Sequence, residues 1–190
     1  MPFTIVRQDI TKMNVDAIVN AANTELQRGG GVCGAIFQAA GADRLQASCN
    51  PLAPIQTGQA VITPGFDLPA KYIIHTAGPV YDSQKTEESE RLLRSAYTES
   101  LRLAAENGCD SIAFPLISAG IYGYPKDEAL RVATEAIRDF LADREMDVTL
   151  TVFDKSSFAV SRDLLGDVAS YIDEHYVDAH AISRRSEHEG

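Results

Sequence analysis

The sequence predicts an α/β fold, with helices on both faces of a largely parallel sheet. Three observations predict it. Six short apolar segments have strand character, and several are continuously apolar and rich in Val and Ile, as in strands covered on both faces. Longer segments with helical periodicity alternate with them. The length of 190 residues is typical of one domain. We therefore expect a single three-layer α/β/α sandwich.

The candidate strands are apolar runs spread over the first 154 residues. In chain order they are FTIVRQDI (3–10), AIVNAAN (17–23), AVITPG (60–65), KYIIHTAG (71–78), SIAFPLI (111–117) and VTLTVFD (148–154).

Four segments between or after these strands predict helices. They are GAIFQAAGADRLQAS (34–48), TEESERLLRSAYTESLRLAAENG (86–108), PKDEALRVATEAIRDFLADR (125–144) and SRDLLGDVASYIDEHYV (161–177). Thr86 and Ser161 are the expected N-caps, Pro125 marks the start of the third helix, and Gly108 ends the second. No repeat or linker interrupts the chain, so we expect one domain over 1–178 and a polar, frayed tail over 179–190.

Charge and cysteine content limit the function classes. The formal net charge of −10 argues against nucleic acid as a partner. The three cysteines have neither disulfide nor zinc spacing, so no metal is expected, and a reducing, cytoplasmic setting is the default. The first residues, MPFTIVRQDI, do not resemble a signal peptide, and no apolar run predicts a membrane span.

Two glycine-rich loops predict an anion site. The first glycine loop is GGGVCG (29–34), and the second glycine loop is SAGIYGYP (118–125). GGGVCG spells G-x-G-x-x-G, but TELQR separates it from the preceding strand and no acidic residue follows at the dinucleotide-binding spacing. Both loops precede a predicted helix, where free N–H groups favour anions. A pair of such loops at one edge of a sheet suits a diphosphate, although either loop alone could be only a packing turn.

Five motifs, in order and at family spacing, closely resemble the macro domain, and most of all its MacroD-type ADP-ribosyl hydrolases. The motifs are QDIT (8–11), VDAIVNAAN (15–23), GGGVCGAIFQAAG (29–41), TGQAVITPGFDLPAKYIIHTAGPVY (57–81) and FPLISAGIYGYP (114–125). The resemblance covers residues 3 to about 155. It implies an α/β/α sandwich on a six-stranded mixed sheet, ADP-ribose as ligand and no cofactor.

The resemblance also implies site residues. Asp9 would bind the adenine amino group with Ile10 beside the base, although an Asp in this context can also be a simple turn cap. Asn23 would contact the hydroxyls of the distal ribose and serve catalysis, whereas Asn20 would make structural hydrogen bonds to the loop. Phe153 would lie against the adenine, and His75 reads as structural rather than as a base. The remaining ligand-binding positions are in the two loops: Gly30, Gly31, Val32, Ser118, Ala119, Gly120, Ile121 and Tyr122.

The sequence departs from the family pattern at two positions of the first glycine loop and the helix after it. MacroD-type enzymes generally read GGGVDGAIH, and this chain reads GGGVCGAIF. Cys33 replaces an aspartate thought to activate the attacking water, and Phe37 replaces a histidine one helical turn later. Cys33 is therefore a catalytic candidate only in a changed role.

Three interpretations stay open at this stage. Hydrolysis of ADP-ribosyl or O-acetyl-ADP-ribose linkages could persist, with Asn23 and the ligand's diphosphate positioning the water. The domain could instead be a non-catalytic module that recognises ADP-ribose or ADP-ribosylated proteins or metabolites. Cys33 itself could act as a nucleophile, although no histidine is placed by sequence to pair with it. A more distant option is an unrelated nucleotide-phosphate hydrolase, such as one that cleaves ADP-ribose-1″-phosphate. No membrane partner is expected, and a monomer is the default.

Overall fold

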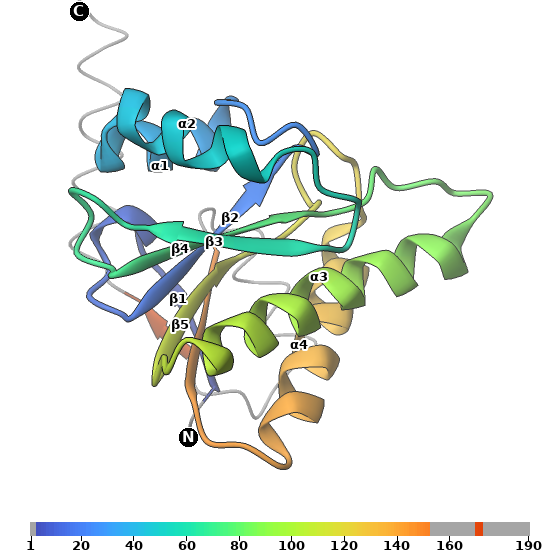
Figure 1. The fold of residues 1–190 in the computed structure, drawn as a ribbon. Coiled ribbons are helices and arrows are strands. Elements are labelled where there is room, and N and C mark those ends of the chain that lie inside the picture. The colour runs from blue at the N-terminus through green and yellow to red at the C-terminus, as the bar shows by residue number, and fades with distance from the viewer. Residues whose placement is uncertain (1–2, 153–169, 173–190) are drawn as a thin grey trace, which may run out of the picture.

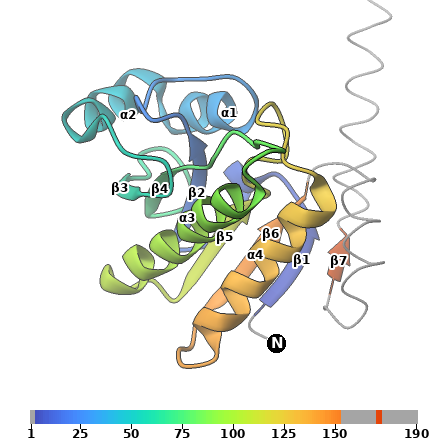
Figure 2. The same cartoon turned by 90° about the vertical axis from the view of Figure 1, so that its right-hand side faces the viewer.

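The computed structural model describes residues 3–152 and 170–172. All six predicted strands are present: β1 (Phe3–Arg7), β2 (Ala17–Ala22), β3 (Ala60–Pro64), β4 (Tyr72–Ala77), β5 (Ser111–Pro115) and β6 (Asp147–Thr151). They form one sheet in the order β3-β4-β2-β5-β6-β1. A three-residue strand, β7 (Ser170–Ile172), adds a seventh strand beyond β1. The α/β sandwich on a mixed sheet is thus confirmed, with β7 as an addition at its edge (Figure 2).

The sheet is mixed because of a single strand. β3 pairs antiparallel with β4, whereas every other described pairing is parallel. β3 and β4 are joined by the short segment 65–71, which is too short for the crossover that a parallel pair needs. The carboxyl ends of the parallel strands all lie along the same edge of the sheet, and the loops predicted to bind a ligand are at this edge.

Helices cover both faces of the sheet. α1 (Gly31–Ala40) and α2 (Ala42–Cys49) lie on one face, and α3 (Thr86–Glu106) and α4 (Lys126–Leu141) lie on the other (Figure 1). The single helix predicted over 34–48 is two helices, because Gly41 has φ +107° and interrupts the helical backbone. Thr86 is the first residue of α3 rather than its N-cap, which is Lys85. Two short 3-10 turns, η1 (Ile10–Lys12) and η2 (Asn50–Leu52), complete the described elements.

One helix prediction is wrong in part. Residues 170–172, inside the segment predicted as a helix over 161–177, pair with β1 as the parallel strand β7. Ser161, its expected N-cap, lies outside the described residues. The helical periodicity of this segment competes with the open edge of β1, and pairing there satisfies backbone groups that an edge strand leaves exposed.

Two apolar cores fill the sandwich, one on each face of the sheet. The core under α3 and α4 includes Tyr97, Phe114 and Leu130. The core under α1 and α2 includes Ile18, Phe37 and Cys49. Alternate residues of the central strands supply both, so β2 contributes Val19 to the first core and Ile18 to the second.

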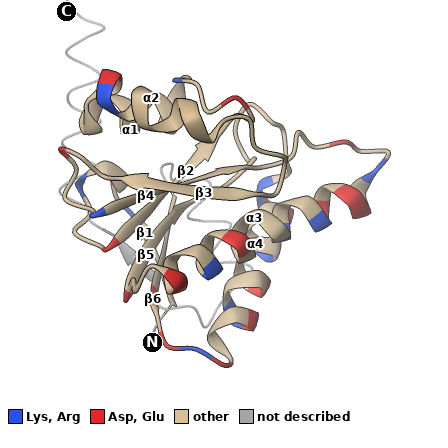
Figure 3. Cartoon of the chain, viewed as in Figure 1, with Lys and Arg blue, Asp and Glu red and all other residues tan. Residues whose placement is uncertain are grey.

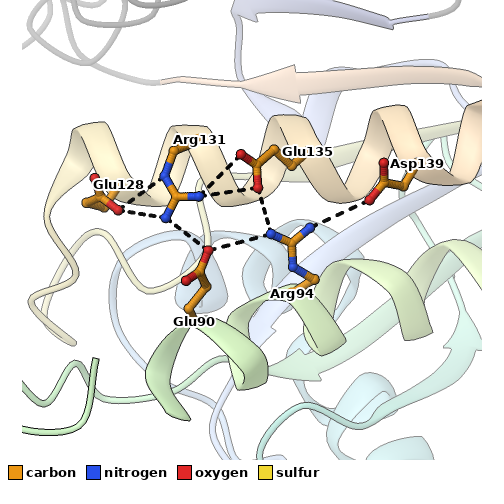
Figure 4. Close-up of polar contacts among 6 residues, drawn as sticks. All are labelled: Glu90, Arg94, Glu128, Arg131, Glu135 and Asp139. Atoms are coloured by element: carbon orange, nitrogen blue, oxygen red, sulfur yellow. Dashed lines mark hydrogen bonds and ion pairs between the residues drawn. The ribbon is translucent and has the colours of Figure 1, made fainter. Parts of the chain in front are cut away.

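The outer surfaces of α3 and α4 are joined by a network of ion pairs. Acidic and basic residues recur along both helices (Figure 3). Arg94 of α3 contacts Glu135 at 2.7 Å, and Arg131 of α4 contacts Glu90 at 2.9 Å (Figure 4). Glu128 and Asp139 extend the network. These side chains are partly exposed, so they align the two helices at a modest gain in free energy.

None of the helices in the described part of the chain is both long and apolar enough to cross a membrane.

Candidate functional site

The predicted site segments converge at one edge of the sheet. The first glycine loop lies between β2 and α1, and the second glycine loop lies between β5 and α4. Asp9 and Ile10 follow β1, and the segment 78–81 follows β4. Since β4, β2, β5, β6 and β1 run parallel, all these segments leave the sheet at the carboxyl ends of their strands, where α/β folds bind ligands. β1 and β2 are separated by two strands, or roughly 14 Å, so the edge suits an elongated ligand.

The N-terminus of α1 is open to an anion. Gly30 is its N-cap and offers no side chain, and the first turn contains no acidic residue. The first N–H groups of a helix have no partner within the helix, and the helix dipole places partial positive charge there. Gly30 and Gly31 are exposed and Val32 is half-buried. Backbone N–H groups of the first glycine loop can therefore bind a negatively charged group.

Close packing fixes the shape of the first glycine loop. A Cβ atom at Gly34 would lie 2.6 Å from the carbonyl oxygen of Gly29, so only glycine fits there. Gln46 of α2 holds the preceding residues: its Oε1 accepts a hydrogen bond from the N–H of Arg28, and its Nε2 donates to the carbonyl of Leu26. The packing at Gly34 and the hydrogen bonds from Gln46 thus hold the loop in this conformation.

The second glycine loop is tied to the segment that follows β4. The hydroxyl of Ser118 donates to the carbonyl of Pro79 at 2.8 Å, and the N–H of Tyr81 donates to the carbonyl of Tyr122 at 2.8 Å. Ser118 is buried, Ala119 and Tyr122 are half-buried, and Gly120 is exposed. Ile121 is 98% exposed, which is unusual for a large apolar side chain and leaves it available to a ligand.

Asn23 is held by the loop that follows β2. Its Oδ1 accepts from the N–H of Gln27 at 3.0 Å, and its Nδ2 donates to the carbonyl of Gln27 at 2.9 Å. An asparagine amide has a second N–H and a second lone pair, so Asn23 can still bind a hydroxyl while the loop fixes its orientation.

Asp9 is the N-cap of η1. Its Oδ1 accepts hydrogen bonds from the N–H and the hydroxyl of Thr11, at 3.0 and 2.7 Å. The turn-cap interpretation of Asp9 is therefore correct, and the second carboxylate oxygen can accept a further bond. Ile10 is buried in the core under α1 and α2.

Cys33 lies in a buried polar cluster that the sequence did not predict. Its Sγ lies 3.7 Å from the Nδ2 of Asn20, and its thiol donates to the carbonyl of Gln27 at 3.9 Å. Asn20 also contacts the Nδ1 of His75 at 3.1 Å. Asn20 thus contacts Cys33 of the first glycine loop, as expected, and the neighbouring strand β4 as well.

His75 continues this cluster into the sheet. It is fully buried, and its Nε2 lies 2.9 Å from the hydroxyl of Thr63 and 3.8 Å from the Sγ of Cys49. Burial lowers the pKa of His75 to about 4, so its imidazole is neutral at pH 7. Burial, with Cys33 nearby, raises the pKa of Cys49 to about 11. The structural interpretation of His75 is confirmed.

One polar atom of this cluster is unusual. The Oδ1 of Asn20 is buried and has no hydrogen-bond partner among the described residues. The signal that could have revealed the cluster is a polar residue inside each of two apolar strands, Asn20 in AIVN and His75 in YIIH. Such residues are buried only when they pair with one another or with neighbouring polar groups.

The remaining predicted positions are apolar. Phe37 is buried in the core under α1 and α2, so the position that carries a histidine in MacroD-type enzymes has a packing role here. Phe153, the predicted adenine contact, lies outside the described residues. Among the residues that the structure describes, no cluster of His, Cys, Asp or Glu could hold a metal ion.

Comparisons with known proteins agree with this arrangement. The macro domain family model matches residues 19–133. O-acetyl-ADP-ribose deacetylase of Cronobacter sakazakii is 45% identical over 168 residues, which is 85% of this chain and 92% of that protein. ADP-ribose glycohydrolase MACROD2 of Xenopus laevis is 49% identical over 145 residues, 76% of this chain and 34% of that protein. A Trypanosoma brucei macrodomain in complex with ADP-ribose superimposes with a TM-score of 0.79 at 37% identity, covering 86% of this chain and 69% of that one.

Proposed function

Because this chain belongs to the macro domain family, we propose that it binds ADP-ribose and hydrolyses ADP-ribosyl or O-acetyl-ADP-ribose linkages at the distal ribose. One observation carries the binding proposal. The uncapped N-terminus of α1 and the second glycine loop follow adjacent parallel strands, so their backbone N–H groups can serve one diphosphate.

The two ends of the ligand then have separate places along the edge. Asp9, at the end of β1, accepts a hydrogen bond from the adenine amino group through the carboxylate oxygen that does not cap η1. Asn23, at the end of β2, binds the distal ribose. The separation of these strands by two others leaves room for the diphosphate between them.

In the proposed hydrolysis, a water molecule attacks at the distal ribose although position 33 carries no carboxylate to activate it. Asn23 orients the ribose, the bound diphosphate helps to position the water, and the N–H groups of both loops stabilise developing negative charge. With a modified glutamate, the bond between the distal ribose and the glutamate oxygen breaks as the water adds to the ribose, and the glutamate takes the proton that the water loses. With O-acetyl-ADP-ribose, the water adds to the acetyl carbonyl, the ester bond to the ribose oxygen breaks, and that oxygen takes the proton as acetic acid leaves. Loss of a general base typically slows such a reaction by about 10²–10⁴-fold, so slow turnover is expected.

The experiment is a turnover assay. A peptide mono-ADP-ribosylated on a glutamate and, separately, O-acetyl-ADP-ribose are incubated with the protein, and release of ADP-ribose is followed by mass spectrometry. We expect ADP-ribose to be released faster with the protein than without it. Asn23→Ala should lower that rate, whereas Asn107→Ala, which removes a comparable side chain-to-backbone hydrogen bond at the end of α3, should not.

A second candidate function is a non-catalytic ADP-ribose recognition module. The burial of Phe37 and the position of Cys33 favour it, because neither side chain can act as the carboxylate or imidazole that MacroD-type enzymes carry there. Saturable ADP-ribose binding together with release at the background rate on both substrates would establish this alternative and reject hydrolysis.

A further inference from the structure

Tyr97 connects α3 to the base of the second glycine loop. Its side chain is fully buried, with its ring against that of Phe114 at 5.1 Å between centroids. The N–H of Ile117 donates to the Tyr97 hydroxyl at 3.0 Å, and this hydroxyl donates to the carbonyl of Pro115 at 3.3 Å. One hydroxyl therefore closes the turn between the last residue of β5 and the start of the loop.

The hydroxyl is suited to both bonds. Burial raises the pKa of Tyr97, so the hydroxyl stays protonated and can donate and accept at once. Ile117 is only 1% exposed, so its N–H could not turn to water if Tyr97 lacked the oxygen.

The residue after Ile117 has an uncommon backbone conformation. Ser118 has φ +67°, the left-handed region that a residue with a Cβ seldom adopts. Such a conformation persists where its surroundings fix it from several sides. Here Tyr97 fixes the preceding N–H, the Ser118 hydroxyl donates to Pro79, and the Ser118 carbonyl accepts from the N–H of Tyr124 at 2.9 Å.

The packing at Gly78 shows how tightly this region is assembled. A Cβ atom there would overlap the hydroxyl of Ser118 and the side chain of Ile117. The loop therefore cannot shift toward β4 to make up for a lost bond at Tyr97.

We propose that Tyr97 is a positioning residue of the ligand site: through its bonds to Pro115 and Ile117 it holds Ser118 in the conformation that presents the second glycine loop to a diphosphate. The inference rests on the proposed function for the identity of the ligand. Affinity for the diphosphate would then depend on the Tyr97 hydroxyl of α3, which is buried inside the sandwich and lies outside both glycine loops.

Tyr97→Phe tests this inference because it removes one oxygen and keeps the ring against Phe114. The matched control is Ser100→Ala, on the same helix, which removes a buried hydroxyl that donates to the Ala96 carbonyl within α3 itself. Each protein is titrated with ADP-ribose and with AMP, and the ratio of the two dissociation constants is compared. A general loss of folded protein lowers the two affinities equally and leaves the ratio unchanged.

Tyr97→Phe should reduce the preference for ADP-ribose over AMP by about 5-fold or more, in line with the loss of a buried hydrogen bond, and Ser100→Ala should leave it unchanged. An unchanged ratio in Tyr97→Phe would overturn the inference while the wild-type titration still supports ADP-ribose binding. If the wild-type protein binds neither ligand, the proposed function fails instead.

A measurement on the wild-type protein keeps the test independent of how the variant folds. ADP-ribose should slow hydrogen exchange of the Ile117 N–H, which donates to Tyr97, more than that of the Cys109 N–H, which donates to Ala104 at the far end of α3. Equal slowing of the two amides would contradict a coupling between Tyr97 and the ligand site.

Discussion

The side-chain amide of Asn20 lies 3.7 Å from the Sγ of Cys33 and 3.1 Å from the Nδ1 of His75. This amide joins α1 to the sheet beneath it, so Cys33 belongs to a buried hydrogen-bonded cluster. Its sulfur accepts a hydrogen bond from the Asn20 amide and its thiol donates to the Gln27 carbonyl, which favours a structural role over nucleophilic attack.

Cys33→Asp should raise turnover. The substitution places a carboxylate in the first turn of α1, where the helix dipole favours negative charge and the Asn20 amide can donate to it. We expect an increase of about 10²–10⁴-fold in the release of ADP-ribose from a modified glutamate.

Cys33→Ser is the matched control for that substitution, since it keeps the size of the side chain and adds no carboxylate. It should leave the slow wild-type rate in place. A loss of all activity in Cys33→Ser and Cys33→Ala would instead support the nucleophile hypothesis.

Two glycine substitutions should separate ligand approach from loop packing. A Cβ at Gly30 meets no atom within 4 Å, so Gly30→Ala should fold as well as the wild-type protein but bind ADP-ribose more weakly, because the added methyl lies where the ligand approaches. A Cβ at Gly34 meets the Gly29 carbonyl at 2.6 Å, so Gly34→Ala should lose stability as well as affinity. Urea denaturation and calorimetric titration of both variants provide the two readouts; equal stability losses would contradict the distinction.

Stability should depend on pH through His75. Its pKa of about 4 in the folded protein lies below the value of 6.5 for an unperturbed histidine. The unfolded chain therefore binds a proton that the folded chain excludes between pH 6.5 and 4. Stability is fully present above pH 6.5, and about 3 kcal/mol of it is lost as the pH falls to 4.

His75→Gln isolates this effect from the titration of carboxylates in the same range. The difference in unfolding free energy between wild type and His75→Gln should shrink as the pH falls from 7 to 4, as measured by urea denaturation at several pH values. Parallel curves for the two proteins would show that His75 does not titrate as proposed.

The ion pairs between α3 and α4 should contribute little individually. Arg94 and Glu135 are 34% and 45% exposed, so solvent screens their attraction despite the 2.7 Å contact. A double-mutant cycle with Arg94→Ala and Glu135→Ala should give a coupling of about 0.5–1 kcal/mol that decreases in 1 M NaCl. A coupling that salt leaves unchanged would contradict this account.

The sequence predicted the fold well where apolar runs decide it. All six strands of the first 154 residues were found because continuous Val and Ile runs mark strands buried on both faces. The helix break at Gly41 is not predicted, since the apolar periodicity continues across this residue while the helical backbone does not. The sequence predicts a helix at β7 because three residues that pair with an open strand edge leave no periodic signal of their own.

The site was predicted only as far as local motifs reach. The glycine loops and Asp9 were recognisable from neighbouring residues, whereas the Asn20 cluster joins residues 13 and 55 positions apart and depends on the parallel pairing of β2 with β4. The same holds for Tyr97, whose partners lie 18 and 20 positions away on the next strand and loop. A single sequence contains no record of such long-range pairs.

The most direct test of the central claim is a calorimetric titration of the full chain with ADP-ribose. We expect saturable binding with one ligand per chain, weakened by Gly30→Ala. The absence of any heat of binding at millimolar ADP-ribose would contradict it.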